Sequence, residues 1–198
     1  TGMATLEEIH AAVKILEDNG TEDISILHCT TEYPTKYPDL NLNVISTLKK
    51  EFPNQKIGYS DHSIGYEVPI AAATLGAVII EKHFTLDNDM PGPDHKASAT
   101  PDILERLVKG VRIVETSLGK YEKEPVEAEI KNKIVARKSI IAKKAIKKGE
   151  VFTEENITTK RPGNGISPMN WYDILGKVSE YDFEEDMLIK HSGFKNQE

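Results

Sequence analysis

Two histidines occupy equivalent places in the sequence, each just past the end of a short apolar run. His62 follows the run at 57–59 and His83 follows the run at 78–80, so the two imidazoles are 21 residues apart. If these runs are neighbouring parallel strands, about 4.8 Å apart, both rings can reach one ion and leave positions open for water or a substrate oxygen. The alternative is that each histidine only hydrogen-bonds its own loop, and spacing alone does not decide between the two.

The residue types around the histidines indicate which ion such a site would take. Imidazole and oxygen ligands, with no pair of cysteines available, favour Mn, Mg or a similar divalent cation over structural zinc. The single cysteine, Cys29, ends an apolar run and is interpreted as a small buried hydrophobe rather than a nucleophile.

Other polar residues lie near the same strand ends. Thr31, Tyr33 and Ser60 offer hydroxyl groups that can bind a phosphate or a sugar, or can simply satisfy the backbone. The loop at 90–95 contains two prolines and a glycine, which hold Asp94 in a fixed direction. Asp94 is therefore a candidate for binding a sugar hydroxyl or for proton transfer, unless the loop is only a rigid solvent loop.

The elements that must position these residues form an alternating pattern. Apolar strand-like runs at 24–27, 57–59 and 78–80 alternate with helical patterns, the last of which covers 101–118. Three parallel strands make a poor free-standing domain, and a complete (β/α)8 barrel takes about 250 residues. We therefore expect an α/β fold in which residues 1–119 are the last three strand-helix units of a TIM barrel, with the earlier strands absent.

The pattern changes after residue 119. Residues 120–136 carry alternating charges and are expected to be a linker, part of which can be helical. Residues 137–198, with a short strand at 139–142 and a turn at 162–165, predict a small β-rich domain. Residues 131–161 hold 10 Lys and Arg against 3 Asp and Glu, which indicates either a solvated face or an anionic partner.

The composition excludes several classes of protein. A net charge of −7 argues against a general nucleic-acid binder. No apolar run approaches the roughly 18 residues of a membrane span, and one cysteine cannot form an intrachain disulfide. We expect a cytoplasmic protein.

Five motifs resemble the sialic acid synthase family, in the order in which that family has them. They are HCTTEYP (28–34), GYSDHS (58–63), EKHFT (81–85), GPDH (92–95) and KRPGNGISP (160–168). The resemblance covers residues 1 to about 190 of the chain. It implies condensation of phosphoenolpyruvate with an N-acylated amino sugar, such as N-acetylmannosamine or a diacetamido sugar, to a nine-carbon sialic-type acid.

The resemblance also assigns roles to residues of the barrel part. It implies a divalent metal, typically Mn, with His62 and His83 as ligands, and Asp94 as the catalytic residue near the sugar aldehyde. Thr31 and Ser60 match phosphoenolpyruvate-binding positions, although some relatives have asparagine where Thr31 stands. Tyr33 matches a sugar-side position.

The second domain resembles the antifreeze-like (SAF, β-clip) domain of these synthases. In that family it covers the barrel mouth of the partner subunit, which implies a domain-swapped homodimer and places Arg161 near the acyl group of the substrate. The family's lysine, other phosphate-binding groups and an early glutamate are absent from this sequence, so the chain is not expected to catalyse alone.

Two other interpretations remain open at this point. The second domain could be a non-catalytic carbohydrate-binding module on a barrel scaffold, or the barrel could be another metal-dependent aldolase or isomerase. The sequence does not identify which amino sugar is used.

Overall fold

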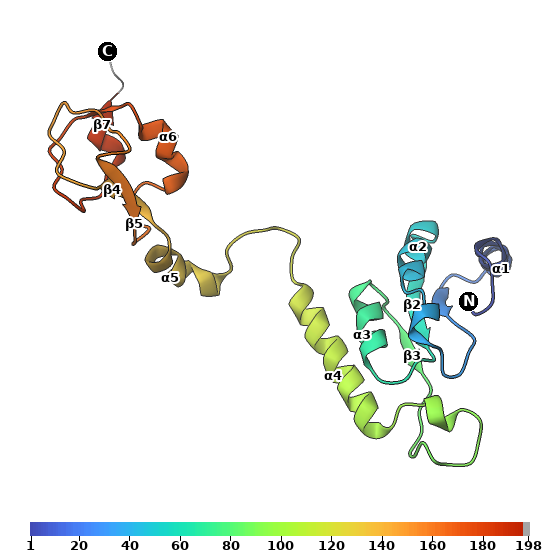
Figure 1. Cartoon of the computed structure of the whole chain (residues 1–198). Helices are drawn as coiled ribbons and strands as arrows, with labels where there is room; N and C mark the ends of the chain where they lie inside the picture. Colours follow the sequence, from blue (N-terminus) through green and yellow to red (C-terminus); the bar gives the residue numbers. More distant parts are fainter. Residues whose placement is uncertain (196–198) are drawn as a thin grey trace. The chain divides into compact units, whose positions relative to one another are not determined.

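The computed structural model describes residues 1–195, which divide into two compact units (Figure 1). The first unit is Thr1–Tyr121 and the second begins at Glu122. Each has its own hydrophobic core. The last three residues of the predicted second domain lie outside the described part of the chain.

None of the helices in residues 1–195 combines the length and the apolar character that a membrane crossing requires.

The first unit alternates strands and helices, as the sequence pattern predicts. Its elements are α1 (Leu6–Asp18), β1 (Ser25–Cys29), α2 (Asn43–Glu51), β2 (Lys56–Asp61), α3 (Glu67–Thr74), β3 (Ile80–Lys82) and α4 (Pro101–Leu118). The three strands form one parallel sheet in the order β1-β2-β3. Parallel strands joined by helical crossovers are the βα arrangement expected of barrel units.

The third strand lies two residues later in the chain than its apolar run. β3 is Ile80–Lys82 and so includes two charged residues, which pattern reasoning excludes from a buried strand. Both charged side chains find partners on β2: Glu81 accepts a hydrogen bond from Ser60, and Lys82 pairs with Asp61. These cross-strand contacts explain why polar residues are tolerated there.

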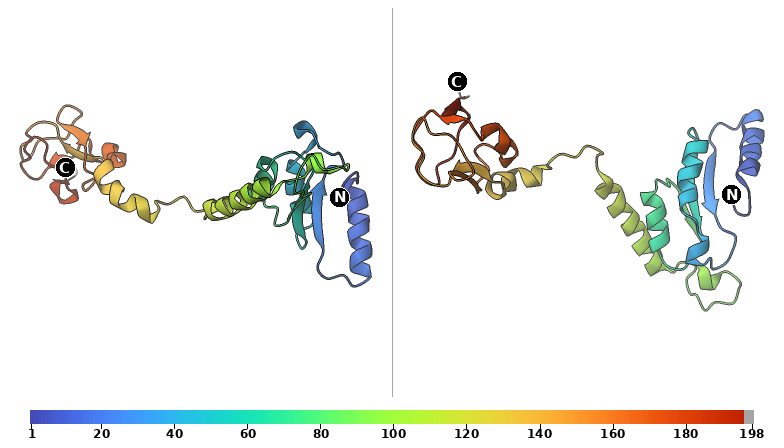
Figure 2. Two further views of the ribbon diagram at one scale, coloured as in Figure 1. Left: turned by 90° about the horizontal axis from the view of Figure 1, so that it is seen from below. Right: turned by 45° about the horizontal axis from the view of Figure 1, so that its top comes forward.

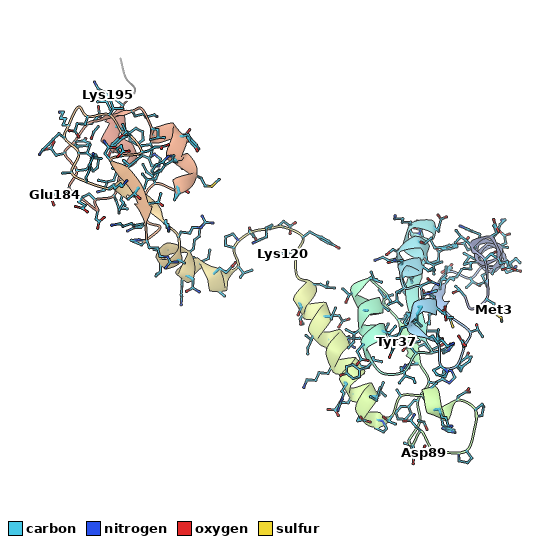
Figure 3. The ribbon with its side chains drawn as sticks, viewed as in Figure 1. Met3, Tyr37, Asp89, Lys120, Glu184 and Lys195 are labelled. Carbon is cyan, nitrogen blue, oxygen red and sulfur yellow. The ribbon has the colours of Figure 1, made fainter. Side chains whose placement is uncertain are left out.

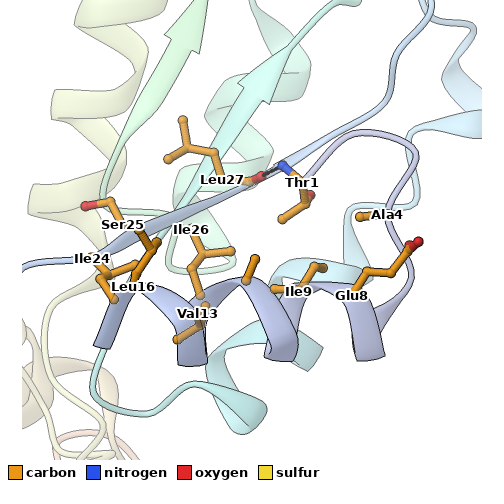
Figure 4. Close-up of a pocket in the computed structure, with 11 residues that line it drawn as sticks. Thr1, Ala4, Glu8, Ile9, Val13, Leu16, Ile24, Ser25, Ile26 and Leu27 are labelled. Carbon is orange, nitrogen blue, oxygen red and sulfur yellow. Dashed lines mark hydrogen bonds between the residues drawn. The ribbon is translucent and has the colours of Figure 1, made fainter. Parts of the chain in front are cut away.

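Helix α1 begins at a capping box and lies along β1 (Figures 2 and 4). The Thr5 hydroxyl accepts from the Glu8 N–H, and the Glu8 carboxylate accepts from the Thr5 N–H. Apolar residues of α1, among them Val13, face Ile26 of β1 across the depression drawn in Figure 4. The helix therefore covers the first strand of the sheet.

The core of the first unit combines side chains from the helices and the strands. Its buried members are Val13, Ile24, Ile26, Ile45, Leu48, Phe52, Ile57, Tyr59, Ala72 and Ala77. Two glycines allow neighbouring elements to approach closely: a Cβ on Gly58 of β2 would lie 2.8 Å from the carbonyl of Ile79, just before β3, and one on Gly110 of α4 would overlap Ile70 of α3. This packing fixes the strand ends on which the candidate site residues lie.

The second unit is built of short elements around a separate core. They are α5 (Glu127–Ala136), β4 (Ser139–Ala142), β5 (Ile157–Lys160), α6 (Trp171–Ile174), β6 (Val178–Ser179) and β7 (Phe194–Lys195). β4 pairs with β5 and β6 with β7, both antiparallel. The buried apolar members of the core are Ile140, Ala142, Ile146, Phe152, Ile157, Ile166, Ile174, Phe183 and Ile189.

Helix α5 falls inside the stretch that the sequence predicts as a linker. All ten of its residues are exposed. Residues 154–156 form a turn before β5, in which the Asn156 side chain accepts from the Thr153 N–H at 2.8 Å and donates to the Val151 carbonyl. An asparagine that satisfies backbone groups on both sides favours a turn over a helix.

Candidate functional site

The carboxyl ends of β1, β2 and β3 meet at one edge of the parallel sheet, and three aromatic rings gather there. The ring centroids of His62 and His83 are 5.3 Å apart, with the rings nearly perpendicular. The Tyr33 ring lies 4.1 Å from that of His62 and 5.4 Å from that of His83. The structure thus brings together three of the residues that the sequence singles out, from three successive strand ends.

A hydrogen bond orients the His62 ring. Its Nδ1 lies 2.7 Å from the carbonyl oxygen of Thr30, which can only accept, so Nδ1 carries the proton. The neutral ring therefore has its lone pair on Nε2. Histidines that bind metals commonly donate their other ring N–H to a carbonyl or carboxylate, and this is the arrangement of His62.

Asp94 lies beside the second histidine. Its Oδ2 is 4.0 Å from Nδ1 of His83, and its side chain is half exposed. The loop that carries it, which includes the Asp89 labelled in Figure 3, is held by hydrogen bonds from Ser98 Oγ to the Asp94 carbonyl and from Asn88 to the carbonyls of His95 and Ser98. The backbone at Asp94 is therefore held in place, while the carboxylate remains open to solvent.

The two hydroxyl groups expected to bind phosphoenolpyruvate have different surroundings. Ser60 is buried, and its Oγ donates to Glu81 Oε1 at 2.6 Å. Thr31 is exposed and lies next to Gly2, where a Cβ would come within 2.6 Å of the Thr31 hydroxyl. The glycine leaves room for the Thr31 side chain.

A buried ionic network lies directly behind the histidines. Lys82 Nζ is 2.6 Å from Asp61 Oδ2, and the two side chains are 4% and 0% exposed. The other carboxylate oxygen accepts from the Tyr59 hydroxyl and from the N–H and hydroxyl of Ser63. Burial, and then the Asp61 carboxylate, raise the pKa of Tyr59, so its hydroxyl keeps its proton and donates.

His28 is a buried histidine near the carboxyl end of β1. Its Nε2 is 2.7 Å from the Leu40 carbonyl oxygen, to which it donates. Burial lowers the pKa of His28, and the Leu40 hydrogen bond opposes this only in part. His28 is therefore a neutral structural residue at neutral pH.

Cys29 is not the fully buried side chain that the sequence predicts. Its side chain is only half buried, and its Sγ lies 3.7 Å from Nδ1 of His62. The thiol borders the histidine cluster.

The side chains at this edge suit a divalent cation that takes few of its ligands from the protein. Within residues 1–195, no cluster of three or more His, Cys, Asp or Glu side chains forms a complete metal site. Two converging imidazoles, one with Nε2 free, would leave the remaining positions to oxygen ligands from water or substrate, as catalytic sites require.

Arg161 belongs to the second unit. It is exposed, and its Nε donates to the Ala136 carbonyl at 3.1 Å. The turn that follows it is held by buried Ser139, whose hydroxyl donates to the Pro162 carbonyl at 2.6 Å and accepts from the Gly165 N–H at 2.8 Å.

Sequence reasoning missed the groups that support the histidines. Asp61, Lys82 and Glu81 stand inside two of the quoted motifs but were given no role there. The available signal was their position: each lies at a strand end, one or two residues before a histidine. The hydrogen bond to the Thr30 carbonyl has no signal in the sequence, because it involves a backbone atom.

Comparison with known proteins gives consistent results for both units. Residues 1–123 match the NeuB family, and residues 137–195 match the SAF domain. The chain is 48% identical to N,N'-diacetyllegionaminic acid synthase of Campylobacter jejuni over 96% of its own length, and 40% identical to pseudaminic acid synthase of the same species over 98%. It spans about half the length of these curated relatives, 57% of the first and 56% of the second.

A solved structure agrees with these matches. N-acetylneuraminic acid (sialic acid) synthetase from Leptospira borgpetersenii shares 39% identity, with a TM-score of 0.60 over 66% of this chain and 45% of that one. The comparisons confirm the predicted fold class, the C-terminal strand-helix units of a TIM barrel followed by an antifreeze-like domain.

Proposed function

Since the chain belongs to the NeuB family, we propose that it supplies the metal-binding part of a synthase that condenses phosphoenolpyruvate with an N-acylated amino sugar. The product would be a nine-carbon sialic-type acid. The observation that carries the proposal is the convergence of His62 and His83, with ring centroids 5.3 Å apart, at the carboxyl ends of neighbouring parallel strands. That edge is where barrel enzymes carry their reactive groups.

The proposed reaction joins three carbons to six. The enol carbon of phosphoenolpyruvate forms a bond to the aldehyde carbon of the open-chain sugar, and the aldehyde oxygen takes up a proton. Water adds at the carbon that bears the phosphate ester, and inorganic phosphate leaves. The result is a 2-keto acid.

His62 and His83 would hold the divalent cation, Mn as the first choice and Mg as the second. When bound, the cation supplies Lewis-acid polarisation of the sugar aldehyde. The Thr30 carbonyl holds a proton on Nδ1 of His62, so in the neutral ring the lone pair for this purpose is on Nε2.

The other residues bind and orient the substrates. Asp94, with a half-exposed carboxylate next to His83, would contact the sugar at its reacting end and transfer a proton there. Thr31 and Ser60 would donate hydrogen bonds to phosphoenolpyruvate, and Tyr33, whose ring flanks both histidines, would line the sugar side. Ser60 would have to exchange its bond to Glu81 for one to the substrate.

Arg161 would act from the antifreeze-like domain of a second copy, in a domain-swapped homodimer. A guanidinium on a proline-glycine turn offers several donors with little freedom to lose, which suits recognition of an acyl group. Further phosphate-binding groups would come from barrel strands outside this sequence, so the chain alone would be inactive.

The test is a Mn²⁺ titration followed by EPR, together with phosphoenolpyruvate-dependent phosphate release, both in the complete protein. His62→Ala and His83→Ala should each abolish Mn²⁺ binding and turnover. His10→Ala, at an exposed histidine that pairs with Glu51, serves as the matched control and should change neither. Normal Mn²⁺ binding in both site variants would refute the proposal.

The amino sugar can be identified in the same assay. N-acetylmannosamine and the diacetamido sugars that lead to legionaminate and pseudaminate should differ in turnover, and the best substrate identifies the product.

A further inference from the structure

The buried pair of Asp61 and Lys82 is placed at a particular point of the sheet. The two residues are register partners at the last pairing of β2 with β3. Asp61 immediately precedes His62, and Lys82 immediately precedes His83. The ion pair therefore joins the two strand ends one residue before each histidine.

The pair lies on the face of the sheet away from the histidine cluster. Successive side chains of a strand point to opposite faces, so residues 61 and 82 point opposite to residues 60 and 81. The Tyr59 side chain, which shares the face of Asp61 and donates to it, belongs to the hydrophobic core. Neither charged group is therefore in a position to contact substrate.

The network also fixes the turn in which His62 lies. Asp61 accepts from both the N–H and the hydroxyl of Ser63, and Lys82 donates to the Ser63 carbonyl at 2.5 Å. Ser63 is fully buried. His62 thus stands between two residues that are both anchored to Lys82 of the neighbouring strand.

Burial of this ion pair costs free energy of folding, so its presence calls for an explanation. Two buried charges lose their hydration, and a pair of well-packed apolar residues at the same place is often as stable or more stable. What apolar residues do not supply is a fixed direction for the turn at residues 61–63, because packing contacts lack the geometry of hydrogen bonds.

We propose that Asp61 and Lys82 are positioning residues that set the distance between His62 and His83 and so determine the affinity for the divalent cation. This inference rests on the proposed function, because it takes the two histidines as the ligands. Groups that hydrogen-bond metal ligands directly commonly change metal affinity by about 10- to 100-fold when they are replaced, and we expect an effect near the lower end for a pair that acts through the adjoining backbone.

The test compares Mn²⁺ affinity, measured by EPR in the complete protein, with melting temperature. The double variant Asp61→Asn/Lys82→Met removes both charges and keeps the side-chain volumes similar, so no buried charge is left unpaired. We expect it to fold and to bind Mn²⁺ at least about 10-fold more weakly. A variant that loses as much melting temperature through the core alone, such as Ile45→Val or Leu48→Ala, is the matched control and should keep wild-type affinity.

The outcomes separate this inference from the proposed function. If His62→Ala abolishes Mn²⁺ binding while the double variant binds as tightly as the control, the positioning role is wrong and the proposed function stands. If His62→Ala itself binds normally, the proposed function fails. Should the double variant not fold, Ser63→Ala replaces it: weaker Mn²⁺ binding than the control supports the role, and unchanged affinity overturns it.

Discussion

The Thr30 carbonyl, just past the end of β1, accepts a hydrogen bond from the His62 ring, just past the end of β2, at 2.7 Å. A backbone atom of one strand end thus selects the tautomer of a side chain on the next. Donation through Nδ1 and the proposed metal coordination through Nε2 can be separated by substitution.

Substitution of His62 by asparagine and by glutamine should separate hydrogen-bond donation from metal binding. The amide of His62→Asn can take the place of Nδ1 and donate to Thr30, so the free energy of unfolding should stay within about 1 kcal/mol of wild type while Mn²⁺ binding is lost. His62→Gln reaches the position of Nε2 and should lose more stability. Chemical denaturation and Mn²⁺ EPR measure the two effects, and tight binding by His62→Asn would contradict the assignment of Nε2.

Asp94→Asn should lower kcat by roughly 100-fold or more if the carboxylate transfers a proton. Mn²⁺ affinity should change little, because the proposed ligands remain. Asp89→Asn alters an exposed carboxylate of the same loop and is the control. A loss of Mn²⁺ affinity that matches the loss of turnover would instead make Asp94 part of the metal site.

Arg161→Ala should raise the KM for the amino sugar and leave the KM for phosphoenolpyruvate unchanged. Arg161→Lys should not restore binding, because an ammonium group lacks the fork of donors. The neighbouring exposed Lys160, which pairs with Asp186, provides the control Lys160→Ala. Equal rises in both KM values would argue against a role in reading the acyl group.

Ser139→Ala should destabilise the second unit by about 1 kcal/mol, because the Pro162 carbonyl and the Gly165 N–H lose their shared partner. The measurement is denaturant unfolding, with Ser192→Ala at an exposed position as control. Equal stability of the two variants would show that the turn does not depend on this hydroxyl.

The lowered pKa of His28 predicts a dependence of stability on pH. In the unfolded chain His28 binds a proton near its ordinary pKa of about 6.5, and in the folded chain it does so only at lower pH. The contribution of His28 to the free energy of unfolding is therefore fully present above pH 6.5 and decreases as the pH falls below that value. The slope from this one group is at most about 1.4 kcal/mol per pH unit. His28→Gln should lose that slope, and an unchanged pH profile between 6.5 and 5 would contradict the prediction.

The sequence predicts those parts of the fold that depend on local pattern. Helical and strand periods identify the βα units, and the rule that reactive groups follow barrel strands leads to His62 and His83. The pair of Asp61 and Lys82 was not predicted, because charged residues at a strand end are usually solvated. Only the register between strands whose partners lie 21 residues apart brings them together, and local pattern does not specify register.

The same limit applies to the position and length of helix α5, since the sequence predicts only that part of the linker can be helical. Its residues carry alternating charges and bury no side chain, so they resemble a linker. A hydrogen bond from the Val126 N–H to the Glu129 carboxylate closes its first turn. Capping of this kind stabilises a helix without contributing to a core, and hydrophobic periodicity does not detect it.

The two separate hydrophobic cores have a consequence for how unfolding is observed. A hydrophobic core is the basis of cooperative unfolding, so calorimetry of the complete protein should be fitted with a separate heat-absorption event for each core. A single midpoint would then be an average over two equilibria. A substitution in one core should act first on the event of its own unit, and the response of the other event measures how far the two units unfold together.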